Sequence, residues 1–187
     1  MMNKVVRLQG KQVDLCVYRT DDDAIDLYLK WVNDEDIVKW IGRNMYTYSY
    51  KEEYDWAHRE HGENEIIFNI VEKSTGKLIG NCDIDVIDNT RNCVLGIMIG
   101  EKDARDRGYG TEVMQMLVKY CFEELYMHNV ILGLNGDNER AHHVYKKVGF
   151  KDCIIEPNAV FYSGKKTSCI QMQILESEYP EIKKNWQ

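Results

Sequence analysis

Four stretches in the first hundred residues carry the alternation of apolar and polar side chains that is typical of half-buried strands. Their ranges are 5–17 (interrupted by a turn at 9–11), 66–71, 78–87 and 93–99. Short turns at residues 74–77 and 88–92 separate the last three stretches. The pattern therefore predicts that these three strands form an antiparallel meander.

Between the first and second of these strands, apolar residues recur at the three-four spacing of a helix. Thr20 precedes three consecutive aspartates, residues 21–23, which suit the positive N-terminal end of a helix dipole. Ile25, Leu29 and Val32 then mark the buried face of this helix. Two shorter helices are expected at residues 36–41 and 51–61.

The second half of the chain predicts helix, strand and helix in that order. From Thr111 onward one helical face carries the apolar residues Met114, Leu117, Val118, Cys121, Phe122 and Leu125. A buried strand at 130–134 and a helix at 138–148 follow, and two last strands flank a turn at 163–165. We therefore expect a single α/β domain spanning residues 1–187. Its mixed central sheet, an antiparallel meander followed by a βαβα arrangement, is flanked by helices on both faces.

Charge divides the chain into unlike halves. Residues 1–90 hold 18 acidic and 11 basic side chains, whereas residues 91–187 hold 13 of each. This balance argues against binding to nucleic acid, which requires a basic surface. It suits a cationic small molecule or a basic peptide end, although solubility alone would also explain it. Seven of the 20 aromatic residues lie within residues 31–56, as expected for a pocket wall or for core packing.

Several classes of site and location are not expected. The six cysteines form no Cys-x-x-Cys pair, and the five histidines show no metal-binding spacing, so we expect no metal and no disulfide framework. No apolar run approaches the roughly 20 residues of a membrane span, and the N-terminus lacks a signal-peptide pattern. A cytoplasmic protein without membrane contact is therefore expected.

Two glycines, Gly108 and Gly110, directly precede the helix that begins near Thr111. Glycines let the backbone approach a ligand closely, and the free amides of a helix start attract anions. Arg105 and Arg107 would add positive charge at the same place. No Gly-Lys-Ser/Thr follows and the preceding strand belongs to a meander, which excludes a Walker loop and a dinucleotide fingerprint. An ordinary turn into a helix would give the same pattern.

A tyrosine on the second helix is expected to face inward. Ala141, Val144, Tyr145 and Val148 share one face by three-four spacing. A buried tyrosine hydroxyl requires a hydrogen-bond partner, either a ligand or a nearby carbonyl. Asn138 is either a helix N-cap or a side chain whose amide binds a ligand.

Together, the two segments resemble the Gcn5-related N-acetyltransferase (GNAT) family. Arg105-x-x-Gly108-x-Gly110 matches the pyrophosphate loop of that family, and the segment from Asn138 through Tyr145 to Gly149-Phe150 matches its downstream motif. The resemblance covers essentially the whole chain. It is nearest to the branch that contains ribosomal-protein N-terminal acetyltransferases and spermidine/spermine acetyltransferases.

The resemblance implies an enzyme, commonly a homodimer, that transfers the acetyl group of acetyl-CoA to a primary amine by direct attack in a ternary complex. Tyr145 would protonate the departing thiolate. The other positions implied to bind the cofactor are Ile97, Met98, Ile99, Arg105, Asp106, Arg107, Gly108, Tyr109, Gly110, Thr111, Asn138 and Ala141. A polyamine-like cation is the expected acceptor, ahead of a protein N-terminus.

The chain departs from the family pattern at two places. Asp106 stands where relatives commonly have glycine, so it either points outward or weakens cofactor binding. Relatives also often carry a glutamate as general base before Gly96, but here Cys93 and Val94 occupy that place, with Cys93 expected beside the cleft. Loss of the base would leave a non-catalytic acyl-CoA-binding module as the alternative function.

Two aspartates on the neighbouring strand are candidates to replace the missing base. Asp83 and Asp85 alternate with apolar residues, so both carboxylates are expected on one face of the sheet. A solvated polar face of the sheet would give the same alternation.

Overall fold

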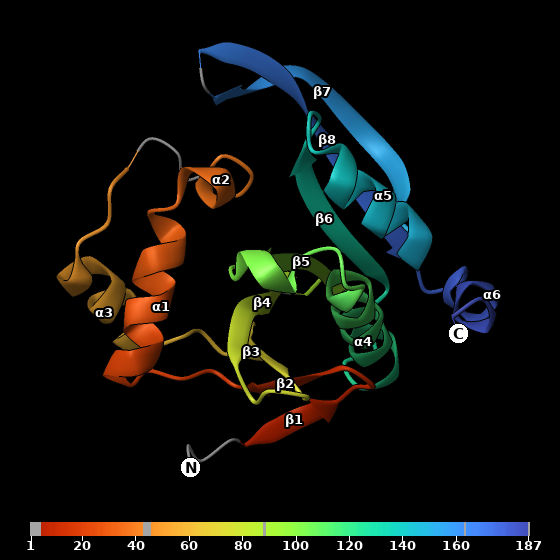
Figure 1. Cartoon of the computed structure of the whole chain (residues 1–187). Coiled ribbons are helices and arrows are strands. Elements are labelled where there is room, and N and C mark those ends of the chain that lie inside the picture. The colour runs from red at the N-terminus through yellow and green to blue at the C-terminus, as the bar shows by residue number, and fades with distance from the viewer. Residues whose placement is uncertain (1–4, 43–45, 88, 163, 187) are drawn as a thin grey trace.

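The computed structural model describes residues 5–42, 46–87, 89–162 and 164–186, and one mixed sheet of eight strands runs through them (Figure 1). Its spatial order is β1-β2-β3-β4-β5-β6-β8-β7. The strands are β1 (Val6–Gln9), β2 (Val13–Val17), β3 (Glu65–Glu72), β4 (Leu78–Ile87), β5 (Asn92–Ile99), β6 (Asn129–Asn135), β7 (Lys151–Tyr162) and β8 (Lys165–Leu175).

Six α-helices and one short 3-10 helix accompany the sheet in the described residues. They are α1 (Asp22–Val32), α2 (Glu35–Val38), α3 (Tyr50–His58), η1 (Lys102–Ala104), α4 (Tyr109–Glu123), α5 (Glu139–Val148) and α6 (Tyr179–Lys184). None of these helices combines the length and the apolar character that crossing a membrane would require.

Helices cover both faces of the sheet, as predicted. The side chains of strand β5 pack against a helix on each face. Cys93 and Leu95 pack in the cluster that contains the apolar face of α4, whereas Met98 packs with Tyr28 and Trp31 of α1. Because successive side chains of a strand point to opposite faces, α4 and α1 lie on opposite sides. Cys93 is therefore fully buried against α4, and the expectation that it lies beside the cleft is wrong.

The meander and the α4–β6–α5 segment agree with the sequence pattern. Asp21 caps α1 by accepting a hydrogen bond from the Ala24 amide at 3.3 Å, and Gly149, with φ of 120°, ends α5. Three features were not predicted: the insertion of β8 between β6 and β7, the short helix η1 and the helix α6. Asp88 and Ser163, which the sequence places in turns, lie outside the described residues.

Strands β5 and β6 pair only at their beginnings. The parallel pairing joins residues 92–94 to residues 129–131, and β5 then continues to Ile99 without a strand partner on that edge. On its other edge β5 stays paired with β4 as far as Ile99. The sheet therefore opens as a wedge between β5 and β6, and the amides along the free edge of β5 face this wedge.

A stability measurement can test how tightly β4 and β5 pack. A Cβ atom at Gly80 would collide with the carbonyl oxygen of Met98 on β5, whereas one at Gly133 of β6 would meet nothing within 4 Å. We expect Gly80→Ala to lower the free energy of unfolding by about 2 kcal/mol, the cost of overpacking a rigid site. Thermal or urea unfolding measures this change. Gly133→Ala is the matched control, and an equal loss in both variants would contradict the packing described.

Candidate active site

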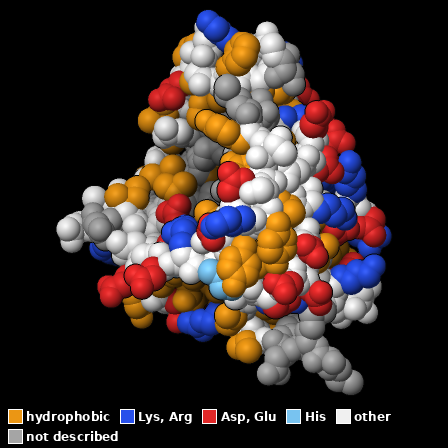
Figure 2. Space-filling view, turned by 90° about the vertical axis from the view of Figure 1, so that its left-hand side faces the viewer, with side chains coloured by type: hydrophobic (Ala, Val, Ile, Leu, Met, Phe, Trp, Pro, Cys, Tyr) orange, Lys and Arg blue, Asp and Glu red, His pale blue; other side chains and the backbone are white. Residues whose placement is uncertain are grey.

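A cavity of about 840 Å³ opens where β5 and β6 separate. Its walls come from α2, α3, the strands β3 to β6, the loop before α4, and α5. Seen from the side of α1 and α3, the surface is hollowed near its middle, with acidic, basic and hydrophobic side chains around the hollow (Figure 2). This volume is in the range of small-molecule and cofactor sites.

One half of the cavity is acidic. Asp83 and Asp85 of β4 line it together, as the alternation in the sequence predicted, and Glu65 of β3 lies beside them. Trp40 and Trp56 also line the cavity, so part of the aromatic-rich segment does form a pocket wall. We call the three carboxylates Glu65, Asp83 and Asp85 the acidic half.

The carboxylates of the acidic half differ in their surroundings. Although partial burial opposes ionisation, His61 at 3.0 Å and Arg59 at 2.5 Å hydrogen bond to Glu65 and lower its pKa. Asp85 pairs with Glu65 across the two strands, and its pKa is raised by partial burial and by the charge of Glu65. Glu65 therefore stays ionised more readily than Asp85, and a cationic ligand would favour the ionised form of Asp85.

Asp83 lies against the part of β5 that has no partner in β6. It pairs with Gly96 of β5, two residues beyond the last residue that pairs with β6. A Cβ atom at Gly96 would be 2.7 Å from Oδ2 of Asp83 and 2.9 Å from its Cγ. Only glycine at this position therefore lets the Asp83 carboxylate lie against the backbone of β5.

The loop before α4 forms the other half of the cavity. Gly108 adopts a φ of 83° at the N-cap, a conformation that favours glycine. The amides of Tyr109, Gly110 and Thr111 donate no hydrogen bond to another described residue, as is usual in the first turn of a helix. Since Gly110 lines the cavity and a Cβ there would meet nothing, these amides border open space. Residues 105–111 thus fit an anionic group, and we call them the anion loop.

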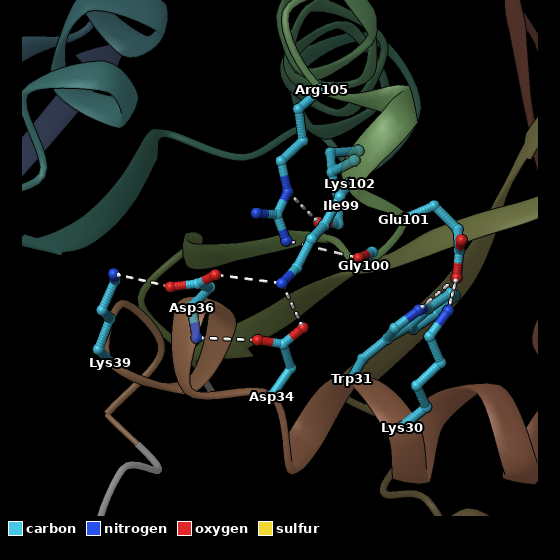
Figure 3. A network of polar contacts seen from close by, with 10 residues as sticks. All are labelled: Lys30, Trp31, Asp34, Asp36, Lys39, Ile99, Gly100, Glu101, Lys102 and Arg105. Atoms are coloured by element: carbon cyan, nitrogen blue, oxygen red, sulfur yellow. Dashed lines mark hydrogen bonds and ion pairs between the residues drawn. The ribbon is translucent and has the colours of Figure 1, made fainter.

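The guanidinium groups of the two arginines in the anion loop bind other groups of the protein. Arg105 lies at the cavity wall, and its guanidinium donates to the carbonyls of Ile99 and Gly100 at 3.3 and 3.4 Å (Figure 3). Arg107 does not line the cavity but pairs with Glu72 at 3.3 Å. The expectation that the Arg107 side chain adds charge at a phosphate site is therefore wrong, and its backbone remains within the loop.

Asp106 points its carboxylate at Arg140 of α5. The two form an ion pair with a distance of 3.2 Å from Nε to Oδ1, and Asp106 has a φ of 61°. Both residues line the cavity, one from the anion loop and one from the facing helix. The ion pair offsets the negative charge that the sequence places beside the loop.

Charged contacts tie α1 and α2 to the segment before the anion loop. Lys102 of η1 bridges Asp34 and Asp36 at the start of α2, at 3.1 Å each, and Glu101 accepts hydrogen bonds from Lys30 and the Trp31 indole at 2.9 Å each (Figure 3). Helices α1 and α2 are thereby fixed to the segment that leads into the loop.

Tyr145 of α5 faces the cavity, as predicted. Its ring packs edge-on against Phe150 at 6.1 Å between centroids, and its hydroxyl makes no hydrogen bond to another described residue. Burial raises the pKa of Tyr145 to about 12, so the hydroxyl keeps its proton at neutral pH. This arrangement can donate a proton to a group in the cavity.

Five further predicted positions also lie at the cavity. Ile97, Met98 and Ile99 lie on the unpaired part of β5, and Asn138 and Ala141 lie at the start of α5. The Oδ1 atom of Asn138 accepts from the Ala141 amide at 3.1 Å, which makes it the N-cap. Its Nδ2 group donates to no described residue, so the cap leaves this donor available to a ligand.

The charged cavity residues that were not identified from sequence include Arg59, Glu65 and Arg140. Glu65 begins β3, one residue before the predicted strand, and it faces Asp85 only because of the register between β3 and β4. Its alternation with Ile67, which also lines the cavity, was the available signal. Arg59 and Arg140 have no such signal, because charged residues surround both in sequence.

Comparison with known proteins gives a consistent result. The family model described as an acetyltransferase (GNAT) domain matches residues 15–151. A protein of Nematostella vectensis named N-acetyltransferase 9-like is 24% identical over 162 residues, which cover 80% of this chain and 79% of that protein. The N-acetyltransferase YnaD of Bacillus subtilis is 22% identical over 135 residues, covering 69% of this chain and 78% of that protein.

Solved structures share the fold at low identity. The spermidine N-acetyltransferase of Vibrio cholerae in complex with CoA and spermine superposes with a TM-score of 0.81 at 20% identity, covering 90% of this chain and 98% of that one. A GNAT-family acetyltransferase from Bacillus anthracis gives a TM-score of 0.78 at 16% identity, covering 91% of this chain and 99% of that one.

Proposed function

The chain belongs to the GNAT family of acetyltransferases, and we propose that it transfers the acetyl group of acetyl-CoA to a primary amine of a small cationic molecule. The observation that carries this proposal is the cavity itself. It joins an anion loop to three carboxylates through the wedge between β5 and β6. An anionic donor and a cationic acceptor would each find a complementary half.

The anion loop suits the pyrophosphate of CoA. The free amides of Tyr109, Gly110 and Thr111 and the dipole of α4 favour negative charge there. The free edge of β5 and the Nδ2 group of Asn138 suit the amides of the pantetheine arm, which both donate and accept hydrogen bonds. These groups would lay the cofactor along the wedge, with its thioester toward Tyr145.

The acidic half suits an amine that is protonated in solution. Asp83 and Asp85, with Glu65 beside them in its ion pair with Arg59, give this part of the cavity a negative charge that attracts a cation. The fold neighbour from Vibrio cholerae is described as a spermidine N-acetyltransferase bound to CoA and spermine. A polyamine-like acceptor is therefore our first choice, ahead of a protein N-terminus.

Asp83 and Tyr145 would carry out the two proton transfers of the reaction. An amine with a pKa near 10 arrives protonated and must lose a proton before it attacks. We assign that proton to Asp83, directly or through water, because its carboxylate lies against Gly96, on the part of β5 that has no partner in β6. A nitrogen–carbon bond then forms, the carbon–sulfur bond breaks, and the thiolate takes a proton from Tyr145. An amide on the free edge of β5 would stabilise the oxyanion.

A panel of amines tests this proposal. CoA thiol release from acetyl-CoA is measured with spermidine, spermine, aminoglycosides, amino acids and peptides with free N-termini. We expect the polyamines to have the highest kcat/KM, and we expect this value to fall with added salt because screening weakens the attraction of the acidic half. If peptides give the highest kcat/KM, the acceptor is a peptide N-terminus and not a polyamine. Binding of CoA without release with any amine would support the non-catalytic alternative.

A further inference from the structure

A buried carboxylate outside the cavity holds the start of α4 in place. Glu72, the last residue of β3, is 6% exposed and lies on the side of the anion loop away from the wedge. The Tyr109 hydroxyl donates to its Oε1 atom at 2.6 Å, and Arg107 Nη1 lies 3.3 Å from the same atom. One oxygen therefore binds the two residues on either side of Gly108.

The Glu72 carboxylate is itself fixed. Its Oε2 atom accepts from the Thr75 hydroxyl at 2.5 Å, and its backbone carbonyl accepts from the Gly76 amide at 2.8 Å within the turn between β3 and β4. The hydrogen bonds from Thr75 and Tyr109 lower the pKa of Glu72, so the group is ionised at neutral pH. Hydrogen bonds to an ionised acceptor are stronger than neutral ones.

The first turn of α4 is held at a second residue in a similar way. Glu112 accepts hydrogen bonds from the Gln12 amide at 2.9 Å and from the Gln12 side chain at 3.2 Å. The turn between β1 and β2 and the turn between β3 and β4 are thus both hydrogen bonded to this end of α4. The amides of Tyr109, Gly110 and Thr111, which border the cavity, belong to the turn of helix that these contacts hold.

We propose that Glu72 is a positioning residue for acetyl-CoA, which sets the direction of the anion-loop amides through Tyr109 and touches neither substrate. This inference rests on the proposed function, because it concerns the binding of that cofactor. Gly108 has no side chain to fix its own conformation, and its φ of 83° must be held from outside. Pre-organised amides lose less free energy on binding an anion than amides that must first be ordered.

The test compares Glu72→Gln with Tyr109→Phe. Tyr109→Phe removes the hydrogen bond to Glu72, and Glu72→Gln replaces its charged acceptor with a neutral one, a loss that corresponds to about tenfold in a binding constant. We expect the Kd of CoA, measured by calorimetry, and the KM of acetyl-CoA to rise about tenfold in each variant, whereas kcat and the KM of the amine change by less than about twofold. The double variant should be no weaker than either single one, because both substitutions act on the same contact.

Two controls separate this role from others. Glu181→Gln, on α6, removes an exposed carboxylate and should leave CoA binding unchanged. Arg107→Ala should weaken binding by no more than about threefold, because its ion pair is half exposed. A full tenfold loss in Arg107→Ala, with a reduced dependence on salt, would overturn the inference in favour of direct contact with the pyrophosphate.

The remaining outcomes are also decisive. Unchanged CoA binding in folded Glu72→Gln and Tyr109→Phe would overturn the positioning role and leave the proposed function intact. Failure of the unmodified protein to bind CoA would instead reject the proposed function. If Glu72→Gln does not fold, Tyr109→Phe decides alone, since it keeps the buried ring and removes only the hydroxyl.

Discussion

Replacing Tyr145 with phenylalanine is expected to lower kcat by about 100-fold, the size of effect that loss of a general acid produces. The hydroxyl faces the cavity without a partner among the described residues, and the ring packs on Phe150, so the substitution removes the proton donor and leaves the packing. Steady-state kinetics with the best amine measure the loss. The KM of acetyl-CoA should change little, because the hydroxyl acts on the leaving thiolate.

The pH dependence provides a second test of the same role. Burial raises the pKa of Tyr145 to about 12, and the acid works only in its protonated form, so its contribution is lost only as the pH rises toward that value. We therefore expect no fall in kcat between pH 8 and pH 10 in the unmodified protein. A fall in this range that disappears in Tyr145→Phe would assign Tyr145 a lower pKa and contradict the buried environment described.

Asp83→Asn is expected to lower kcat/KM at pH 7 by about 100-fold, because the amine loses the group that accepts its proton. At pH values below the pKa of the amine, each increase of one pH unit raises the neutral fraction of the amine in solution tenfold. The loss of kcat/KM in Asp83→Asn should therefore shrink to about tenfold or less by pH 9. Asparagine keeps the volume beside Gly96, which makes lost packing a minor contribution.

Asp85→Asn is the matched control for this prediction. Asp85 lies two residues along the same face of β4 but is more exposed, and it lies opposite Glu65 of β3 and Val94, the last residue of β5 that pairs with β6. We expect it mainly to raise the KM of the amine, by weakening attraction to a cation. A larger loss of kcat in Asp85→Asn than in Asp83→Asn would reverse the assignment of the base.

The local sequence pattern was sufficient to predict the helices, strands and turns that contacts between nearby residues determine. Turn residues at 74–77 separate two alternating stretches, and hairpin pairing follows directly from such a pattern. The apolar face of α4 and the cap at Asn138 are likewise set within a few residues. The cavity residues Gly108, Gly110 and Tyr145 lie at the ends or on the inner faces of these helices, and their location was predictable for that reason.

Contacts between distant segments were not predictable in the same way. Arg107 and Asp106 are neighbours in sequence, but one pairs with Glu72 of β3 and the other with Arg140 of α5. Only the assembled sheet determines these partners. The ranking of Asp83 over Asp85 also depends on where β5 leaves β6, which is a property of the pairing register and not of either strand alone.

The position of β8 has a consequence for synthesis on the ribosome. Every residue that we assign to the site precedes β8 in the chain, yet β6 reaches β7 only through β8, which pairs with both. A nascent chain that has already released the anion loop, the acidic half and Tyr145 still lacks the strand that joins β7 to the wall formed by β6. Such long-range pairing forms late and leaves strand edges exposed meanwhile. The residues of the site are therefore synthesised before the strand that joins β7 to the wall formed by β6.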